Sequence, residues 1–503
     1  MNNLIKKILE ANVYDVAVET PLDFAPLLSK RFTSKIYLKR EDLQPVFSFK
    51  IRGAYNKIRQ LSDAAKKNGV VTASAGNHAQ GVALAASRLG IKSTIVMGEN
   101  TPVIKVNAVS ALGARVILSG DSYDQAADVA KALSIEKGFT YIHPFDDEDV
   151  IAGQGTIGVE MLRQYTGALS AIFVPVGGGG LISGIGAYVK YLRPEVSIIG
   201  VESEGSACLW AALEKGRRVT LKAEDLDQFA DGTAVRQVGK KTYSIASKCV
   251  DEVIRVTVDE ICAAIKDIYE ENRIISEPSG ALAVAGLKKY IERGHSGETL
   301  FAIVSGANVN FDRLRHISER TEIGEQRELL LSVTIPEKPG SFKQFCKAIG
   351  KRNITEFNYR FANKKQARVL VGVQISGGPA GRNRLIESLS KRYEVTDLSS
   401  NEVAVLHVRH MVGGRAGVQN EKLFRFEFPE KPGALLTFLE VLGEQYNISM
   451  FHYRNHGAAY GRVLVGIQVP DREMANFMKD LKKVGYRFWD ETANPAYELF
   501  LVD

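Results

Sequence analysis

The sequence predicts an α/β protein with a mostly parallel sheet, followed by a smaller α+β region made of two similar units. Two observations carry this prediction. From residue 16 to about residue 304, short apolar runs alternate with amphipathic helical stretches, which is the pattern of parallel strands joined by helical crossovers. From residue 329 onward, one sequence pattern occurs twice, which indicates an internal repeat.

The apolar runs are short and continuous, so the expected strands are buried on both faces by helices. Helices are expected at residues 51–61, 78–89 and 123–137. In such sheets, ligands bind beyond the carboxyl ends of the strands, in the loops that lead into helices. The strands are expected at residues 35–38, 69–72, 93–97, 115–118, 171–176, 197–201 and 299–304.

Composition argues against several classes of function. The 503 residues allow about three domains, and a charged content of 24% is ordinary for a globular protein. The net charge of +7 includes no basic run, so nucleic acid is not an expected partner. We expect neither a signal peptide nor a membrane span, and no metal site. The cysteines form no CxxC pair, which favours reduced thiols in a cytoplasm; they are Cys208, Cys249, Cys262 and Cys346.

One stretch, residues 48–54, reads Ser-Phe-Lys-Ile-Arg-Gly-Ala and places Lys50 directly before the helix expected at residues 51–61. The positive end of a helix dipole disfavours charge on the ammonium of this lysine. A partly neutral amine is what Schiff-base chemistry requires, so Lys50 is the candidate catalytic residue. On this local pattern alone, the alternative is a solvated surface lysine.

Two loops that lead into expected helices have the composition of binding sites. Residues 72–81 are mostly small, and their backbone amides could hold a carboxylate while Asn77 donates to an oxyanion. The alternative is a helix cap by Ser74 or Asn77. Residues 176–182 contain four consecutive glycines between a strand and a helix, where several amides can converge on a phosphate. The alternative is a flexible turn, and the loop matches neither the dinucleotide nor the P-loop pattern.

A third loop, residues 304–310, closes the last strand of the α/β region. Its Ser305 could be a plain cap of the following turn. The alternative is that the hydroxyl of Ser305 meets the nitrogen of a bound ring.

The repeat pairs Gly340 with Gly433 at an offset of 93 residues, and Arg368 with Arg462 at an offset of 94. Each unit is expected to run strand, helix, strand, strand, helix, strand, a βαββαβ arrangement. The polar stretch before the repeat is expected to be a connecting helix or linker. The expected divisions are a first domain at residues 1–316, a linker at 317–328, one unit at 329–406, a joint at 407–420 and a second unit at 421–503.

Together these motifs resemble those of the threonine dehydratases (threonine deaminases), a family of pyridoxal 5′-phosphate (PLP) enzymes, along essentially the full chain. The resemblance implies a fold type II catalytic domain of two open, mostly parallel α/β subdomains. The repeat resembles the two ACT-like regulatory units of the long biosynthetic form, which short catabolic dehydratases and serine racemases lack. The matching motifs are SFKIRGAY around Lys50, SAGNHAQG around Asn77, VPVGGGGL around Gly177, EPSGALA from Glu277 and SGANVNF from Ser305.

The resemblance also implies roles for single residues. Lys50 would bind PLP as a Schiff base and then act as the general base, Asn77 would bond the 3-hydroxyl of the ring, and Ser305 would meet the pyridine nitrogen. The PLP phosphate would lie on Gly177, Gly178, Gly179, Gly180 and Leu181, and the substrate carboxylate on the loop containing Ser74, Ala75, Gly76 and His78.

The implied reaction is an α,β-elimination that converts L-threonine into 2-oxobutanoate and ammonia, the first committed step of isoleucine biosynthesis, with L-serine as a further substrate. The resemblance further implies a cytoplasmic homotetramer. Isoleucine would inhibit the enzyme, and valine would oppose this inhibition. Effector-binding candidates are Asn358, Tyr359, Arg360, Phe361, His452, Tyr453 and Arg454. The alternative for each is that it only packs the two units together.

Two rival functions share much of this pattern. A serine racemase or serine dehydratase would use most of the same site, but the methyl group of Ala75 cannot transfer a proton where racemases tend to carry a serine. An amino-acid sensor without activity is disfavoured because the candidate site residues are all present. The preference for threonine over serine rests on one methyl group, which no motif reveals. A monovalent cation near Glu202 and Asp231 is left unassigned.

Overall fold

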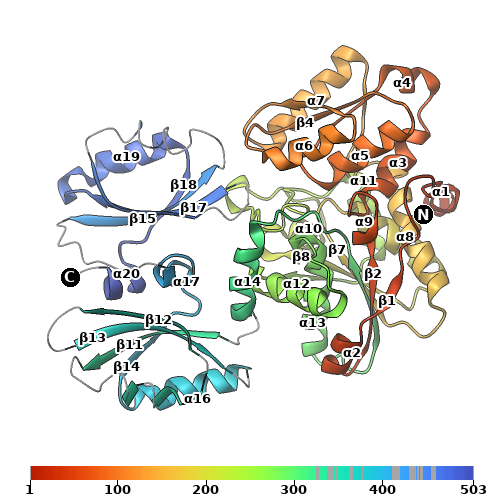
Figure 1. The fold of residues 1–503 in the computed structure, drawn as a ribbon. Helices are drawn as coiled ribbons and strands as arrows, with labels where there is room; N and C mark the ends of the chain where they lie inside the picture. The colour runs from red at the N-terminus through yellow and green to blue at the C-terminus, as the bar shows by residue number, and fades with distance from the viewer. Residues whose placement is uncertain are drawn as a thin grey trace. The chain divides into compact units, whose positions relative to one another are not determined.

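The chain folds into two compact units, residues 1–311 and 312–503, in this computed structural model (Figure 1). The structure describes residues 2–324, 328–336, 344–345, 348–350, 352, 354–361, 366–375, 378–410, 420–429, 438, 441, 446–454 and 460–501. Within these residues, no helix is both long and apolar enough to cross a membrane.

The first unit contains two separate sheets. The larger has the order β1-β2-β10-β7-β8-β9, and all its pairs are parallel except the edge pair of β1 with β2. The smaller has the order β5-β4-β3-β6 and is parallel throughout. This confirms the predicted pair of mostly parallel α/β subdomains. The larger sheet comprises Leu22–Phe24 (β1), Lys35–Arg40 (β2), Ala171–Pro175 (β7), Ser197–Ser203 (β8), Glu252–Val256 (β9) and Thr299–Val304 (β10), and the smaller Val70–Ala73 (β3), Ser93–Met97 (β4), Arg115–Leu118 (β5) and Thr140–Tyr141 (β6).

Helices follow most of these strands, as the alternating pattern predicted. Helices and short 3₁₀ turns of the first unit are Asn2–Glu10 (α1), Pro26–Phe32 (α2), Glu41–Leu43 (η1), Lys50–Arg59 (α3), Asp63–Asn68 (α4), Asn77–Arg88 (α5), Val103–Ala111 (α6), Tyr123–Lys137 (α7), Glu148–Gln164 (α8), Gly180–Leu192 (α9), Glu204–Ser206 (η2), Cys208–Glu214 (α10), Ala223–Asp225 (η3), Lys240–Cys249 (α11), Val258–Asn272 (α12) and Pro278–Glu292 (α13).

The side chains of each strand point alternately to the two faces of the smaller sheet, which explains why helices cover both faces. Val70 and Ile95 pack into the core formed with α3 and α5, whereas their neighbours Val71 and Val96 pack against α7. Successive side chains of a strand point to opposite faces, so a strand with apolar residues at every position needs helices on both sides.

Helices α3 and α8 cross at a contact that only glycine permits. A Cβ on Gly153 of α8 would lie 2.6 Å from the carbonyl oxygen of Arg52 and 2.7 Å from the Cα of Gly53. A Cβ on Gly81 of α5 would lie 3.1 Å from the carbonyl carbon of Lys50. The backbone at the start of α3 is therefore approached closely by two other helices.

The second unit begins with a helix and contains two four-stranded antiparallel sheets. Their orders are β12-β13-β11-β14 and β16-β17-β15-β18, so equivalent strands of the two repeats take equivalent places. The elements are Arg313–Gly324 (α14), Glu328–Pro336 (β11), Ile354–Phe361 (β12), Gln366–Gln374 (β13), Gly378–Ser390 (α16), Glu394–Asp397 (β14), Glu402–Leu406 (α17), Val408–His410 (η4), Glu421–Pro429 (β15), Asn447–Arg454 (β16), Tyr460–Gln468 (β17), Asp471–Glu473 (η5), Met474–Val484 (α19), Arg487–Asp490 (β18) and Pro495–Phe500 (α20).

Each repeat ends in a short helix beyond its last strand, a feature that the βαββαβ prediction did not include. Helices α17 and α20 lie between the two sheets of this unit (Figure 1), where Val403 and Phe500 share a core with Leu330 and Leu423. The residues before the two helices also meet, because Asn401 Nδ2 donates to Asn494 Oδ1 at 3.1 Å. The two repeats are thus joined through equivalent parts.

We predict that Gly153→Ala destabilises the first unit, whereas Gly158→Ala on the same helix does not. A Cβ at position 158 would meet Ile185 at 3.5 Å, an ordinary van der Waals distance. Overpacking at position 153 should lower the free energy of unfolding by about 1–3 kcal/mol. Removing a helical glycine at position 158 should be neutral or stabilise by up to about 1 kcal/mol. Thermal unfolding followed by circular dichroism measures both, and equal melting temperatures would contradict the crossing described above.

Candidate active site

Loops that follow β3, β7 and β10 line a pocket in the first unit, together with the start of α3 and the start of α13. This is the position that parallel sheets favour for ligands. The pocket brings together the residues that the sequence predicted for a cofactor, namely Lys50, Asn77, Gly177, Gly178, Gly179, Gly180, Leu181 and Ser305.

Lys50 is the first residue of α3, whereas the sequence placed it directly before a helix at residues 51–61. Its Nζ donates to the carbonyl oxygen of Pro144 at 3.1 Å. Enclosure in the pocket disfavours the ammonium and lowers the pKa of Lys50 to about 8, although the nearby carboxylate of Glu277 acts in the opposite direction. Lys50 is therefore a neutral amine in about half of the molecules near pH 8 and in a minority of them at pH 7.

A chain of three side chains fixes the amide of Asn77. Asn308 Nδ2 donates to Asn77 Oδ1 at 2.6 Å, and Asn77 Nδ2 donates to Glu277 Oε1 at 2.6 Å. An ionised carboxylate only accepts hydrogen bonds, so the NH₂ group of Asn77 must face Glu277. Its second N–H can then serve a ligand in the pocket.

Glu277 is a pocket residue to which sequence analysis assigned no role. It lies at the N-terminal end of α13 and is almost fully buried, with its carboxylate against Asn77. The EPSGALA motif was the signal that pointed to this position. Asn77 is 200 residues away in the chain, so only the fold brings the two side chains into hydrogen-bond contact.

The glycine loop between β7 and α9 lacks side chains because neighbouring groups fill their space. A Cβ on Gly178 would lie 2.2 Å from Cγ of Phe145, and one on Gly177 would lie 2.9 Å from the Cα of Thr233. Gly179 has a φ of +90°, which strains any residue with a side chain. The loop thus presents backbone amides at the N-terminal end of α9, an arrangement that binds anions.

Two donors at the start of α11 hold the carbonyl oxygen of Gly178. Thr242 Oγ1 donates to it at 2.7 Å, and the amide of Gly239 donates at 3.3 Å. The N–H and C=O of a trans peptide point in opposite directions, so this anchoring turns the amide of Gly179 away from α11.

Asp146 in turn holds the start of α11 in place. Its carboxylate accepts from the backbone amides of Lys240 at 2.9 Å, Lys241 at 2.7 Å and Thr242 at 3.1 Å. These are the amides that a helix leaves without internal partners. Phe145, Asp146 and Thr242 lie outside the sequence motifs and act on the glycine loop only through the fold, so no sequence pattern identifies them.

Ser305 directly follows β10, is buried, and is one of the residues that line the pocket. Its Oγ donates to the carbonyl oxygen of Ser279 at 3.4 Å. Its own carbonyl oxygen accepts from the amide of Phe49 at 3.3 Å, which connects this loop to the segment carrying Lys50. The hydroxyl is neutral and can both donate and accept.

The loop predicted to hold a carboxylate lies beside Asn77, but Ser74, Ala75, Gly76 and His78 are not among the residues that line the described pocket. Ser74 Oγ accepts from the amide of Gly76 at 3.2 Å, while Ala75 packs against the core of the smaller subdomain. His78 is buried, and its Nε2 bonds the carbonyl oxygen of Ile142 at 3.0 Å. Desolvation lowers the pKa of His78 to about 3, so this imidazole is neutral.

Glu202 and Asp231, which the sequence left open as neighbours of a cation, have protein partners. The buried carboxylate of Glu202 accepts from the amides of Leu209 at 2.9 Å and Trp210 at 2.8 Å, and burial raises its pKa to about 8. Asp231 Oδ2 accepts from Lys105 Nζ at 2.8 Å. Across the residues that the structure describes, no group of three or more His, Cys, Asp or Glu side chains is arranged for a metal ion.

Comparison with protein families assigns both units. A family described as "Pyridoxal-phosphate dependent enzyme" matches residues 13–306. The C-terminal regulatory domain of threonine dehydratase matches twice, at residues 319–408 and 412–501. The two matches to the regulatory domain correspond to the two repeats.

Relatives with similar sequences cover the full chain. A biosynthetic L-threonine dehydratase of Burkholderia multivorans is 52% identical over 505 residues, which are 99% of this chain and 99% of that protein. Another of Escherichia coli K12 is 51% identical over 99% of this chain and 96% of its own length.

Solved structures match about three-fifths of the chain. The processed form of threonine deaminase isoform 2 from Solanum lycopersicum has a TM-score of 0.62 and 48% identity, covering 63% of this chain and 92% of its own. Serine racemase from Dictyostelium discoideum has a TM-score of 0.57 and 34% identity, covering 61% of this chain and 99% of its own.

We predict that Lys50 reacts with an amine-directed reagent half-maximally near pH 8, because only the neutral amine is nucleophilic. Glu277→Gln should move this midpoint to lower pH, because it removes the charge that raises the pKa of Lys50. The measurement is the rate of Lys50 modification across pH, by mass spectrometry of the peptide.

The matched control for this experiment is Glu214→Gln, a substitution at an exposed position in α10. It should leave the Lys50 profile unchanged. A profile that moves to higher pH in Glu277→Gln would contradict the assigned electrostatics.

Proposed function

Because this chain belongs to the pyridoxal-phosphate dependent enzymes, within the biosynthetic threonine dehydratases that carry a C-terminal regulatory domain, we propose that it converts L-threonine into 2-oxobutanoate and ammonia. The observation that carries this proposal is the 52% identity over the full chain, which includes both the PLP region and the duplicated regulatory domain. The placement of Lys50 in a pocket opposite the glycine loop supports it.

The described residues fit pyridoxal phosphate. The glycine loop is a cradle that side chains would fill, so its amides and that of Leu181 can hold the phosphate. The remaining N–H of Asn77 can donate to the ring hydroxyl, and the hydroxyl of Ser305 can meet the ring nitrogen. Lys50 would supply the amine that binds the aldehyde carbon of the cofactor.

When bound, the cofactor supplies the electron sink that makes the α-proton of an amino acid acidic. The chain supplies the base, because the amine of Lys50, with a pKa near 8, can take up the α-proton at Nζ. The carbonyl oxygen of Pro144 accepts a hydrogen bond from the same Nζ and orients it. Ser305 would be a neutral partner for the ring nitrogen, which would moderate the electron sink and restrain side reactions.

Overall, L-threonine loses its α-proton and its β-hydroxyl as water. The resulting enamine tautomerises and takes up one water as ammonia leaves, which gives 2-oxobutanoate. We propose L-serine as a second substrate, since the two amino acids differ by a single methyl group and pockets discriminate weakly at that level.

A serine racemase is the second candidate, since the serine racemase of Dictyostelium discoideum shares the catalytic fold. Racemisation needs a second acid on the opposite face of the substrate. Ala75 carries only a methyl group, and the neutral His78 already uses its Nε2 on Ile142. Ala75 and His78 therefore favour elimination over racemisation.

We propose that the regulatory unit binds isoleucine as an inhibitor and valine as its antagonist, and that the enzyme is a cytoplasmic homotetramer. The candidate segments occupy equivalent edge strands, β12 for Asn358, Tyr359, Arg360 and Phe361, and β16 for His452, Tyr453 and Arg454. The side chains of these residues lie outside the described parts of the structure.

A cluster around Glu402 supplies a route for coupling within the regulatory unit. Glu402, at the start of α17, pairs with Arg462 at 2.9 Å and Arg425 at 3.2 Å, both from the second repeat. Arg320 of α14, the helix that precedes the repeats, approaches the same carboxylate at 3.7 Å. One carboxylate thus connects α14 to both repeats.

The proposed function is tested by assaying 2-oxobutanoate formation from L-threonine in the wild type and in Lys50→Ala. The variant should lose turnover and the visible absorbance of bound PLP, because no other amine of the pocket can replace Nζ. An unchanged melting temperature of the cofactor-free protein serves as the control for folding. Appreciable turnover in Lys50→Ala would refute the role of Lys50, and a wild type without any 2-oxobutanoate formation would refute the function.

We predict that isoleucine makes the threonine response sigmoidal and shifts it several-fold, since allosteric coupling typically amounts to about 1–3 kcal/mol. Valine should reverse the shift. A chain ending at Phe311 corresponds to the first compact unit and should keep activity while losing the response. Inhibition of this shorter chain at the same isoleucine concentration would place the effector site in the catalytic unit.

A further inference from the structure

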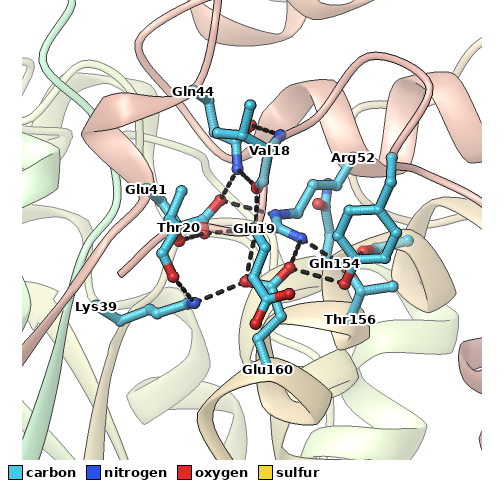
Figure 2. A network of polar contacts seen from close by, with 12 residues as sticks. Val18, Glu19, Thr20, Lys39, Glu41, Gln44, Arg52, Gln154, Thr156 and Glu160 are labelled. Atoms are coloured by element: carbon cyan, nitrogen blue, oxygen red, sulfur yellow. Dashed lines mark hydrogen bonds and ion pairs between the residues drawn. The ribbon is translucent and has the colours of Figure 1, made fainter. Parts of the chain in front are cut away.

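We propose that Arg52 is a positioning residue for Lys50, acting through a buried network of four charges that fixes the first turn of α3. This inference rests on the proposed function for its catalytic consequence. The network consists of Arg52, Lys39, Glu41 and Glu160, whose side chains are all fully buried. Figure 2 shows them converging from β2, η1, α3 and α8.

Two carboxylates accept hydrogen bonds from the guanidinium of Arg52, each along a different edge of the group. Its Nε and Nη2 donate to Glu41 Oε2 and Oε1, each at 2.8 Å. Its Nη1 and Nη2 donate to Glu160 Oε1 and Oε2 at 2.5 and 3.0 Å. Further bonds reach Thr156 Oγ1 and the carbonyl oxygen of Val18, both at 3.1 Å. Bidentate pairs of this kind fix orientation as well as distance.

The remaining members of the network balance its charge. Lys39 Nζ donates to Glu160 Oε2 and to the carbonyl oxygen of Thr20, both at 2.6 Å. Burial alone would raise the pKa of Glu160, but Arg52 and Lys39 outweigh it and the pKa is lowered. Burial lowers the pKa of Lys39, while the carboxylate of Glu160 acts in the raising direction. Two basic and two acidic side chains are therefore packed against one another with no exposed surface.

This network acts on Lys50 because Arg52 is only two residues further along α3. The amide of Arg52 donates to the carbonyl oxygen of Phe49 at 3.0 Å, which closes the turn that contains Lys50. Gly153 and Gly81 approach the same turn from α8 and α5. If the turn shifted, a buried guanidinium would leave its carboxylates, which is strongly unfavourable.

An ion pair at the other end of α3 provides the matched control. Lys57 Nζ pairs with Asp147 Oδ2 at 2.9 Å and with Asp149 Oδ2 at 3.0 Å, so it also joins α3 to the start of α8. Its side chain is 20% exposed and lies two turns from Lys50. A purely structural role for Arg52 predicts that Lys57→Met and Arg52→Lys differ only in how much they lower the melting temperature.

The test compares Arg52→Lys, Lys57→Met and the wild type as full chains. Arg52→Lys keeps the charge but cannot form two bidentate pairs. Before PLP is added, the pH profile of Lys50 modification should move toward higher pH in Arg52→Lys, as Lys50 gains access to water. With PLP, equilibrium dialysis should show weaker binding, and kcat should fall by roughly 100-fold with a smaller change in KM. Lys57→Met should keep the wild-type profile and PLP affinity.

A wild-type Lys50 profile and PLP affinity in Arg52→Lys would overturn the proposal, even if the melting temperature fell. If Arg52→Lys does not fold, Glu160→Gln tests the same proposal. This substitution removes the charge of one carboxylate of the network while keeping the shape of the side chain. The profile of Lys50 does not depend on the substrate. A shifted profile in a protein whose wild type forms no 2-oxobutanoate would support positioning and refute the proposed function.

Discussion

The guanidinium of Arg52 is fully buried, and this constraint governs how the catalytic unit assembles. An uncompensated buried charge costs roughly 3–5 kcal/mol, so the fold must bring carboxylates to Arg52. They come from η1 and from α8, 11 and 108 residues away in the chain. Such a network adds little net stability over an apolar core, but it penalises every arrangement in which α3 is misplaced.

The site depends on this placement because its parts come from separate loops. Lys50 begins α3, Asn77 begins α5, the glycine loop follows β7, and Ser305 follows β10. Contacts between the loops keep them together, as between the amide of Phe49 and the carbonyl of Ser305. Glycines occur where two pieces of backbone or an aromatic ring approach too closely for a Cβ. A precise pocket therefore follows from close packing around a few fixed turns.

The regulatory unit is built on a different principle. Its two repeats have the same strand order, and their terminal helices α17 and α20 share one core between the sheets. Asn401 and Asn494 each cap one of these helices and also bond each other. Duplication thus supplies both partners of the contact, and Glu402 breaks the symmetry because proline occupies the equivalent position 495.

The sequence by itself determined the parallel α/β architecture, the helix-start position of Lys50, the glycine loop and the duplicated C-terminal region. These features follow from periodicity and local composition, which short stretches of chain carry. Only the tertiary structure decided that Glu277 faces Asn77, that Phe145 fills the space beside Gly178, and that Arg52 is sandwiched between Glu41 and Glu160. A carboxylate in a helix or turn has the same local pattern whether it faces water or a buried cation. The choice is made by burial, because removing water forces each charge to find a partner from a distant segment.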